Sequence, residues 1–107
     1  MTKRRVSYGI ASLLLFAAST SSVAQSGADT YKAKCQMCHS ADGSADTPAG
    51  KATKARALSS PEVLKESDTD LLVIIKSGKN KMPAFNGKLT DAQMKEVLDY
   101  VHTLQKK

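Results

Sequence analysis

Cys35-Gln36-Met37-Cys38-His39 is the stretch that decides how this chain is organised. It contains both cysteines of the 107-residue sequence and one of its two histidines. On a helix, positions i, i+3 and i+4 share one face of a single turn, so the two thiols and the imidazole would project to the same side. Two thiols at this spacing can form thioether bonds to one flat macrocycle, and the adjacent imidazole can reach a metal at its centre.

The C-x-x-C-H pattern is the attachment signature of a c-type haem. It predicts thioether bonds from Cys35 and Cys38 and an axial iron ligand at His39. Three other uses of the cysteines stay open, namely a redox dithiol, half of a zinc site, and a disulfide across two residues, which is geometrically tight. The sequence has no βαβ unit of the kind that holds a redox dithiol, and only His102 remains as a further Cys or His ligand for zinc.

The first 24 residues have the pattern of a cleaved secretory signal peptide. Three basic residues at positions 3–5 precede an apolar run, Ile10–Ala18, and small residues follow at Ser22 and Ala24. An uncleaved membrane anchor is the alternative, although the run is shorter than a bilayer span. Cleavage after Ala24 would leave residues 25–107 as one domain in the periplasm.

The charge and size of the mature chain restrict its function and its stability. Without the three basic signal residues, 13 basic and 10 acidic side chains remain, a net charge of +3. This is too mild for a nucleic-acid-binding surface, so no nucleic-acid partner is expected. A domain of about 80 residues has an apolar core that is only marginally stable and usually needs a further stabilising element. A buried haem would provide one, because the chain can pack against its large apolar surface. We therefore expect the haem-free chain to fold poorly.

The mature sequence predicts short helices and no strand pair, so the predicted fold class is all-α. We expect a first helix from near Gly27 to Cys38, then an irregular loop over residues 40–58. Ser60-Pro61 predicts a short helix over 61–66, and Ser67 or Asp68 caps another that ends at Ser77, before Gly78. The capping box Thr90-x-x-Gln93 begins the last helix. Its apolar stripe comprises Met94, Val97, Leu98, Val101 and Leu104.

A glycine-bracketed loop before the last helix contains a candidate second iron ligand. Proline disfavours the α conformation at the residue before it, so Met82 should be extended, and Pro83 stiffens the loop beside it. A thioether held on a stiff loop opposite a histidine is how a sixth iron ligand would be presented. Alternatively, Met82 fills a gap in the core, as methionines often do. Met37 and Met94 are poorer candidates because of their places in the haem motif and the core stripe.

With these motifs in order, the chain resembles the small bacterial class I cytochromes c over about residues 26–105. C-Q-M-C-H matches the haem motif of that family, and K-M-P-A-F matches its methionine loop. Gly27 and Tyr31 match its first helix, and Val97 and Tyr100 match its last. The resemblance implies a cytochrome c fold, in which several short helices wrap one covalently bound haem c. It also implies that the N- and C-terminal helices cross, with Gly27 allowing close approach.

With His39 and Met82 on the iron, no coordination position stays open for oxygen or peroxide chemistry. The expected function is therefore that of a non-enzymatic one-electron carrier that cycles Fe(II) and Fe(III) between redox partners. Those partners would be redox proteins or membrane-bound oxidoreductase complexes, and we expect a monomer. Two alternatives stay open: a peroxidase-like or redox-sensing protein in which Met82 leaves the iron, and a thiol–disulfide oxidoreductase using the two cysteines.

Three further expectations concern residues around the ligands. In the resembled family the proximal histidine donates its second ring N–H to a backbone carbonyl. For His39 the candidate acceptor is the Pro48 carbonyl. Alternatively, Pro48 is simply a residue of a turn. Lysines flank both ligand segments and either steer an acidic partner or are merely solvated. They are Lys32, Lys34, Lys76, Lys79, Lys81 and Lys88. His102 is expected at the surface or boundary, with iron ligation as the alternative.

Overall fold

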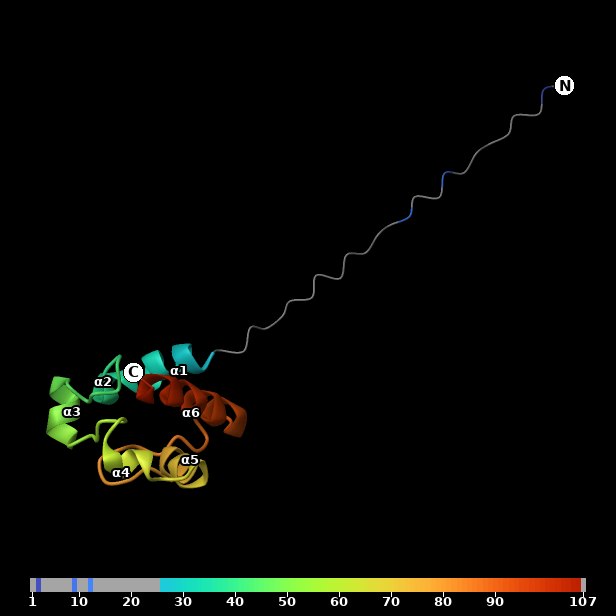
Figure 1. Ribbon diagram of the computed structural model, residues 1–107. Helices are drawn as coiled ribbons and strands as arrows, with labels where there is room; N and C mark the ends of the chain where they lie inside the picture. Colours follow the sequence, from blue (N-terminus) through green and yellow to red (C-terminus); the bar gives the residue numbers. More distant parts are fainter. Residues whose placement is uncertain (1, 3–8, 10–11, 13–25, 107) are drawn as a thin grey trace.

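The computed structural model describes residues 26–106, together with Thr2, Gly9 and Ser12. The described residues form six helices and, apart from two isolated bridges, no β-structure, which confirms the all-α prediction (Figure 1). The predicted signal peptide lies almost wholly outside the described residues. The helices are α1 (Gly27–Lys34), α2 (Gln36–His39), α3 (Pro48–Thr53), α4 (Pro61–Leu64), α5 (Asp68–Ser77) and α6 (Asp91–Gln105).

Hydroxyl caps start five of these helices. In each case the cap oxygen accepts a hydrogen bond from a backbone N–H of the first turn, which would otherwise lack a partner. The cap residues are Ser26, Thr47, Ser60, Ser67 and Thr90. Thr90 also forms the predicted capping box with Gln93. The starts of α4, α5 and α6 are therefore where the sequence predicted them.

The structure differs from the prediction at three places. The expected helix from Gly27 to Cys38 is interrupted at Cys35, whose φ of −119° leaves the helical range. Helix α3 occupies part of the segment 40–58 that was predicted to be an irregular loop. The third difference is small: α4 ends at Leu64, two residues before the expected end.

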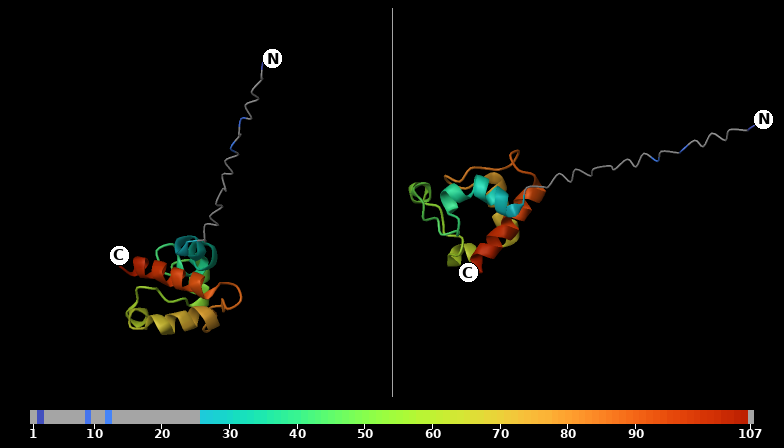
Figure 2. Two further views of the ribbon diagram at one scale, coloured as in Figure 1. Left: turned by 90° about the vertical axis from the view of Figure 1, so that its right-hand side faces the viewer. Right: turned by 90° about the horizontal axis from the view of Figure 1, so that it is seen from above.

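The first and last helices cross, as the resemblance implied (Figures 1 and 2). At the crossing a Cβ on Gly27 would overlap the Glu96 carbonyl, so only glycine permits this approach. Beside it the rings of Tyr31 and Tyr100 lie 5.2 Å apart, and their planes are tilted by 58°. Helix α5 packs on α6, and α4 lies beside α5 on the side of the molecule away from α1. Helix α3 contacts α2.

The buried apolar residues form three small clusters rather than one continuous core. Tyr31 with Val97, Val101 and Leu104 joins α1 to α6. Val63, Leu71 and Leu98 join α4, α5 and α6. Phe85, Leu89 and Met94 hold the methionine loop against the start of α6. Members of all three clusters line the cavity described next.

Candidate haem site

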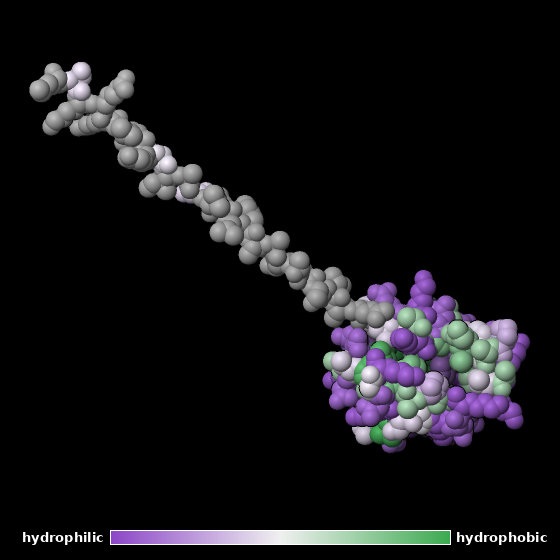
Figure 3. Space-filling view, turned by 180° about the vertical axis from the view of Figure 1, so that it is seen from behind, coloured by the Kyte–Doolittle hydropathy of each residue, from purple (hydrophilic) through white to green (hydrophobic). Residues whose placement is uncertain are grey.

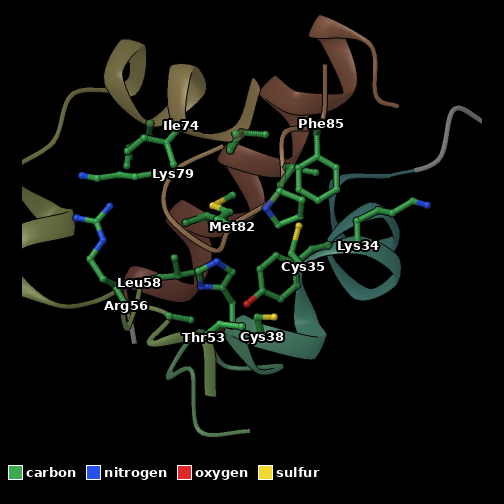
Figure 4. A pocket seen from close by; sticks show the side chains of 18 of the residues that line it. Lys34, Cys35, Cys38, Thr53, Arg56, Leu58, Ile74, Lys79, Met82 and Phe85 are labelled. Atoms are coloured by element: carbon green, nitrogen blue, oxygen red, sulfur yellow. The ribbon is translucent and has the colours of Figure 1, made fainter. Parts of the chain in front are cut away.

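All four predicted site residues line a single cavity of about 580 Å³. Cys35, Cys38 and His39 come from the segment that joins α1 to the end of α2, and Met82 comes from the loop after α5 (Figure 4). A volume of this size is in the range of cofactor pockets. The structure thus brings together groups that lie more than 40 residues apart in the sequence.

One turn of backbone holds the cysteine motif. The Cys35 N–H donates to the Tyr31 carbonyl at 2.8 Å, and the Cys35 carbonyl accepts from the N–H of His39 at 2.9 Å. Cys38 also donates its N–H to that carbonyl, at 3.2 Å. Ser40 then ends α2 with a left-handed φ of 68°. Both thiols are free, and both side chains are partly buried beside the cavity.

The surroundings of Cys35 do not suit a redox dithiol. Burial, and to a smaller extent the neighbouring Cys38, raise the pKa of its thiol to about 11. A dithiol oxidoreductase needs the opposite, a thiolate stabilised by a lowered pKa. Among the described residues no group of three or more His, Cys, Asp or Glu side chains is placed to hold a metal ion, so the zinc alternative finds no ligand set. His102 does not line the cavity.

His39 has the environment of a ligand rather than of a surface histidine. Burial lowers the pKa of its imidazole, the Arg56 backbone opposes this as a hydrogen-bond acceptor, and the Arg56 guanidinium lowers it further. A neutral imidazole is the form that binds a metal. Nδ1 is buried and has no hydrogen-bond partner of good geometry within the described chain. The expected bond to the Pro48 carbonyl is therefore absent, because Pro48 instead begins α3 and Arg56 supplies the backbone acceptor near the ring.

Helix α3, which was not predicted, supports the haem motif, and its last residue, Thr53, lines the cavity. The Thr47 hydroxyl donates to the Met37 carbonyl at 2.6 Å. Gly50 packs so closely that a Cβ there would overlap the carbonyls of Cys38 and Ala45. The Tyr31 hydroxyl, buried on α1, donates to the Ser40 carbonyl at 2.6 Å. These contacts fix the end of α2 and hence the position of His39.

A tight turn presents Met82 to the cavity. Lys79 and Met82 exchange two backbone hydrogen bonds, of 2.9 and 3.2 Å, across Asn80, which has a φ of 54°. Gly78 has a φ of 75°, and a Cβ there would lie 2.6 Å from the Met82 carbonyl oxygen. Beyond Pro83, the Phe85 N–H donates to the Ile75 carbonyl at 3.0 Å, which ties the loop to α5.

Cationic side chains gather at the cavity, but only some of those expected. Lys34, Lys79 and Lys81 line it, and Lys32, Lys76 and Lys88 do not. Lys76 pairs instead with Asp91 at 3.5 Å. Lys54 and Arg56 were not predicted at the site, yet they also line it. Seen from behind, polar side chains cover most of the folded part, with apolar residues exposed between them (Figure 3).

Sequence reasoning missed Arg56 and Leu58 as residues of the cavity wall. The Arg56 guanidinium forms two hydrogen bonds to the Glu66 carboxylate, of 3.1 and 3.3 Å, which join the loop before α4 to the segment after it. Leu58 packs against the cluster of Tyr31 and Val97. Neither residue stands in a motif, because their place depends on how the segment after α3 folds back. Nothing local in the sequence would have found them.

In the described part of the chain, no helix is both long enough and apolar enough to cross a membrane.

Known proteins are similar to this chain over most of its length. The family model for "Cytochrome C oxidase, cbb3-type, subunit III" matches residues 22–101. Cytochrome c6 of Thermostichus vulcanus is 32% identical over 105 residues, covering 94% of this chain and 91% of that protein. Cytochrome c6 of Parathermosynechococcus lividus is 36% identical over 75 residues, covering 70% and 83%. The solved structure of the KustC0563 c-type cytochrome matches with a TM-score of 0.68 at 29% identity, over 75% of this chain and 98% of that one.

The residues of the cavity fit the group that this likeness implies. Two free thiols, an imidazole and a thioether line one pocket of suitable volume, and most of its other lining residues are apolar. On this evidence the chain belongs to the cytochrome c family, as a monohaem class I c-type cytochrome whose cofactor is covalently bound haem c.

Proposed function

We propose that haem c is bound to the Cys35 and Cys38 thiols, with His39 and Met82 as the axial iron ligands. The chain is an electron-carrying haem protein, and this assignment makes it a one-electron carrier rather than an enzyme. The observation that supports it is the convergence of these four side chains on one cavity from two distant segments. With both His39 and Met82 bound, the iron would have no position for a substrate.

When bound, the haem supplies one-electron chemistry by cycling between Fe(II) and Fe(III). The residues of the chain set how easily that happens. The Met82 thioether is soft and neutral, so as an iron ligand it would favour Fe(II) and raise the potential. Apolar side chains from α5 and α6 exclude water, which disfavours the more highly charged ferric state. The Gly78–Met82 turn and the turn that ends at His39 are held by backbone hydrogen bonds, so little structure has to change on electron transfer.

We also propose that residues 1–24 are a signal peptide and that the mature domain, residues 25–107, works in the periplasm as a monomer. Its partners would be redox proteins or membrane-bound oxidoreductase complexes with acidic surfaces. Lys34, Lys79 and Lys81 at the cavity support such docking, because like charges around one edge raise the encounter rate with an anionic partner.

Absorption spectra of the purified exported protein, reduced and oxidised, test the haem assignment. We expect a haem spectrum whose pigment stays with the polypeptide in denaturant, and its loss in a Cys35→Ala/Cys38→Ala variant. Free-thiol titration of the wild type should find no reactive cysteine, since thioethers do not react. Colourless protein after normal maturation, or pigment released by denaturant, would refute the assignment.

Met82→His tests the axial ligand. The substitution should lower the midpoint potential, because imidazole stabilises Fe(III) relative to a thioether. Met37→His is the matched control: Met37 is 77% exposed on the same haem motif, so its substitution should leave the potential nearly unchanged. Equal potentials for Met82→His and the wild type would show that Met82 is not the ligand.

Electron exchange with an anionic probe, hexacyanoferrate, tests the lysine docking surface. The rate should fall as salt is added, and Lys34→Glu should slow it at low ionic strength. Lys32→Glu makes the same charge change on α1 at a residue that does not line the cavity, so it should slow the reaction less. A rate independent of salt, or equal effects of the two variants, would remove the steering role.

A further inference from the structure

A chain of three hydrogen bonds runs from the surface of α6 to the wall of the haem cavity. His102 Nε2 lies 2.8 Å from a carboxylate oxygen of Asp68, the first residue of α5. His102 Nδ1 lies 2.8 Å from Oε1 of Gln105, one turn further along α6. The Gln105 side-chain nitrogen donates to the Leu58 carbonyl at 2.8 Å. Leu58 lines the cavity, so this series of hydrogen bonds links a partly exposed histidine to the cofactor pocket.

Chemistry fixes the direction of each of these bonds. A backbone carbonyl only accepts, so the Gln105 amide must turn its nitrogen toward Leu58 and its oxygen toward His102. An ionised Asp68 carboxylate also only accepts. Both ring nitrogens of His102 therefore face acceptors, and both bonds form only when each nitrogen has a proton. The arrangement is that of an imidazolium.

The charges around His102 favour the same state. Its pKa is raised, first by the hydrogen bond to Gln105 and then by the hydrogen bond and charge of Asp68 and the charge of Asp99, while partial burial opposes them. Asp68 faces the ring from α5, and Asp99 lies on α6 itself. The segment around Leu58 contributes its carbonyl through Gln105. His102 also lies in the last turn of α6, where the helix dipole favours a cation.

Deprotonation of His102 would break this series of hydrogen bonds at Gln105. A neutral imidazole keeps a single N–H, and the ionised Asp68 carboxylate is the stronger acceptor, so Nε2 would keep it. Nδ1 would then present a lone pair to the Gln105 oxygen, and the two would repel. The Gln105 amide would have to turn, which removes its donor from the Leu58 carbonyl.

We propose that His102 is a positioning residue, whose protonated side chain holds the Leu58 wall of the haem cavity against α6 and releases that wall when it is neutral. The packing of Leu58 beside the haem would then follow the titration of a histidine that lies outside the cavity. This proposal goes beyond electron transfer and holds whichever residues are the axial ligands.

Methyl and imidazole NMR of the holoprotein, recorded across pH 5 to 9, tests the proposal directly. The Leu58 methyl shifts should move with the apparent pKa of the His102 ring, at a value above the ordinary one of about 6.5. Ile75 is the internal control, because it lines the same cavity from α5 and has no place in the hydrogen-bond chain. Its methyl shifts should not follow that transition.

Two variants separate the chain of bonds from a general pH effect. In Gln105→Leu the His102 ring should still titrate, at a lower pKa, while the Leu58 shifts stop following it. In His102→Gln the Leu58 transition should disappear. A Leu58 transition that persists in either variant would assign it to another group and overturn the proposal, as would flat Leu58 shifts in the wild type. If His102→Gln folds poorly, Asp68→Asn should move the His102 and Leu58 transitions downward together.

Discussion

Gly78 decides how Met82 reaches the cavity. Its φ of 75° is in the left-handed region, and a Cβ there would lie 2.6 Å from the Met82 carbonyl oxygen and 3.0 Å from the Ala84 nitrogen. Gly78→Ala should therefore combine backbone strain with overpacking and destabilise the holoprotein by roughly 2–5 kcal/mol. If Met82 is the sixth ligand, the variant should also have a lower midpoint potential, since the turn that presents the thioether has to shift. Denaturant unfolding and potentiometry measure the two effects.

Gly87→Ala separates the two causes. Gly87 has a similar φ of 80°, but a Cβ there would meet no described atom within 4 Å. It should therefore show the backbone term alone, roughly 1–2 kcal/mol, with an unchanged potential. Equal losses of stability in the two variants would mean that contact with the Met82 carbonyl contributes nothing.

At the scale of elements, the crossing of α1 and α6 depends on the absence of one side chain. Gly27→Ala would normally favour a helix, yet here the added carbon meets the Glu96 carbonyl. We expect a loss of about 1–3 kcal/mol in unfolding free energy from overpacking. Ala28→Gly, the reverse exchange at the next and exposed position, should lose only about 1 kcal/mol of helix propensity. A Gly27→Ala protein that is more stable than the wild type would show that the helices can separate freely.

The link between α5 and α6 should make stability depend on pH. The pKa of His102 is raised in the folded chain, so its contribution is fully present below the unfolded value of about 6.5 and is lost as pH rises through the folded value. Because His102 and Asp68 are partly exposed, the contribution should be below about 1 kcal/mol. Thermal melts of wild type and His102→Gln should differ at pH 5.5 and converge above the folded pKa. A constant difference across this range would contradict the assignment.

The helices were predictable where a local signal specifies them. Ser60-Pro61, Ser67 and the Thr90–Gln93 box each act within one turn, so the sequence alone located α4, α5 and α6. Thr47-Pro48 has the same cap-and-proline signal as Ser60-Pro61, and it was overlooked because the segment around it is polar and irregular. The break at Cys35 has no local signal.

The residues of the candidate site were likewise predictable only where they belong to a local sequence motif. Cys35, Cys38, His39 and Met82 stand in motifs whose spacing reflects their chemistry, and the structure places all four on one cavity. Arg56 and the Gln105–Leu58 bond depend on contacts between segments far apart in sequence, which no motif records. The Pro48 prediction was wrong for that reason, because the register of the loop after His39 is set by how α3 packs on α2.

At the scale of the whole molecule, the cavity lies where a continuous core would be expected. The three apolar clusters meet around it, and members of each face into it. Without the haem, the apolar side chains that line this space of about 580 Å³ would face water, and each Å² of exposed apolar surface costs about 25 cal/mol. A typical domain is stable by only about 5–15 kcal/mol, so exposure on this scale is a large fraction of its stability. The clusters alone therefore do not suffice to hold this arrangement.

The haem-free protein should accordingly lose its fixed packing. Cys35→Ala/Cys38→Ala, purified without pigment, should keep part of its helical far-UV signal, because the capped helices α5 and α6 are local. It should lose near-UV signal, bind a hydrophobic dye and melt without a sharp transition. Met82→Ala is the matched control, since it removes a proposed ligand and leaves both thiols, so it should retain pigment and still unfold cooperatively. A sharp, cooperative melt of the haem-free variant would show that the three clusters form a sufficient core without the cofactor.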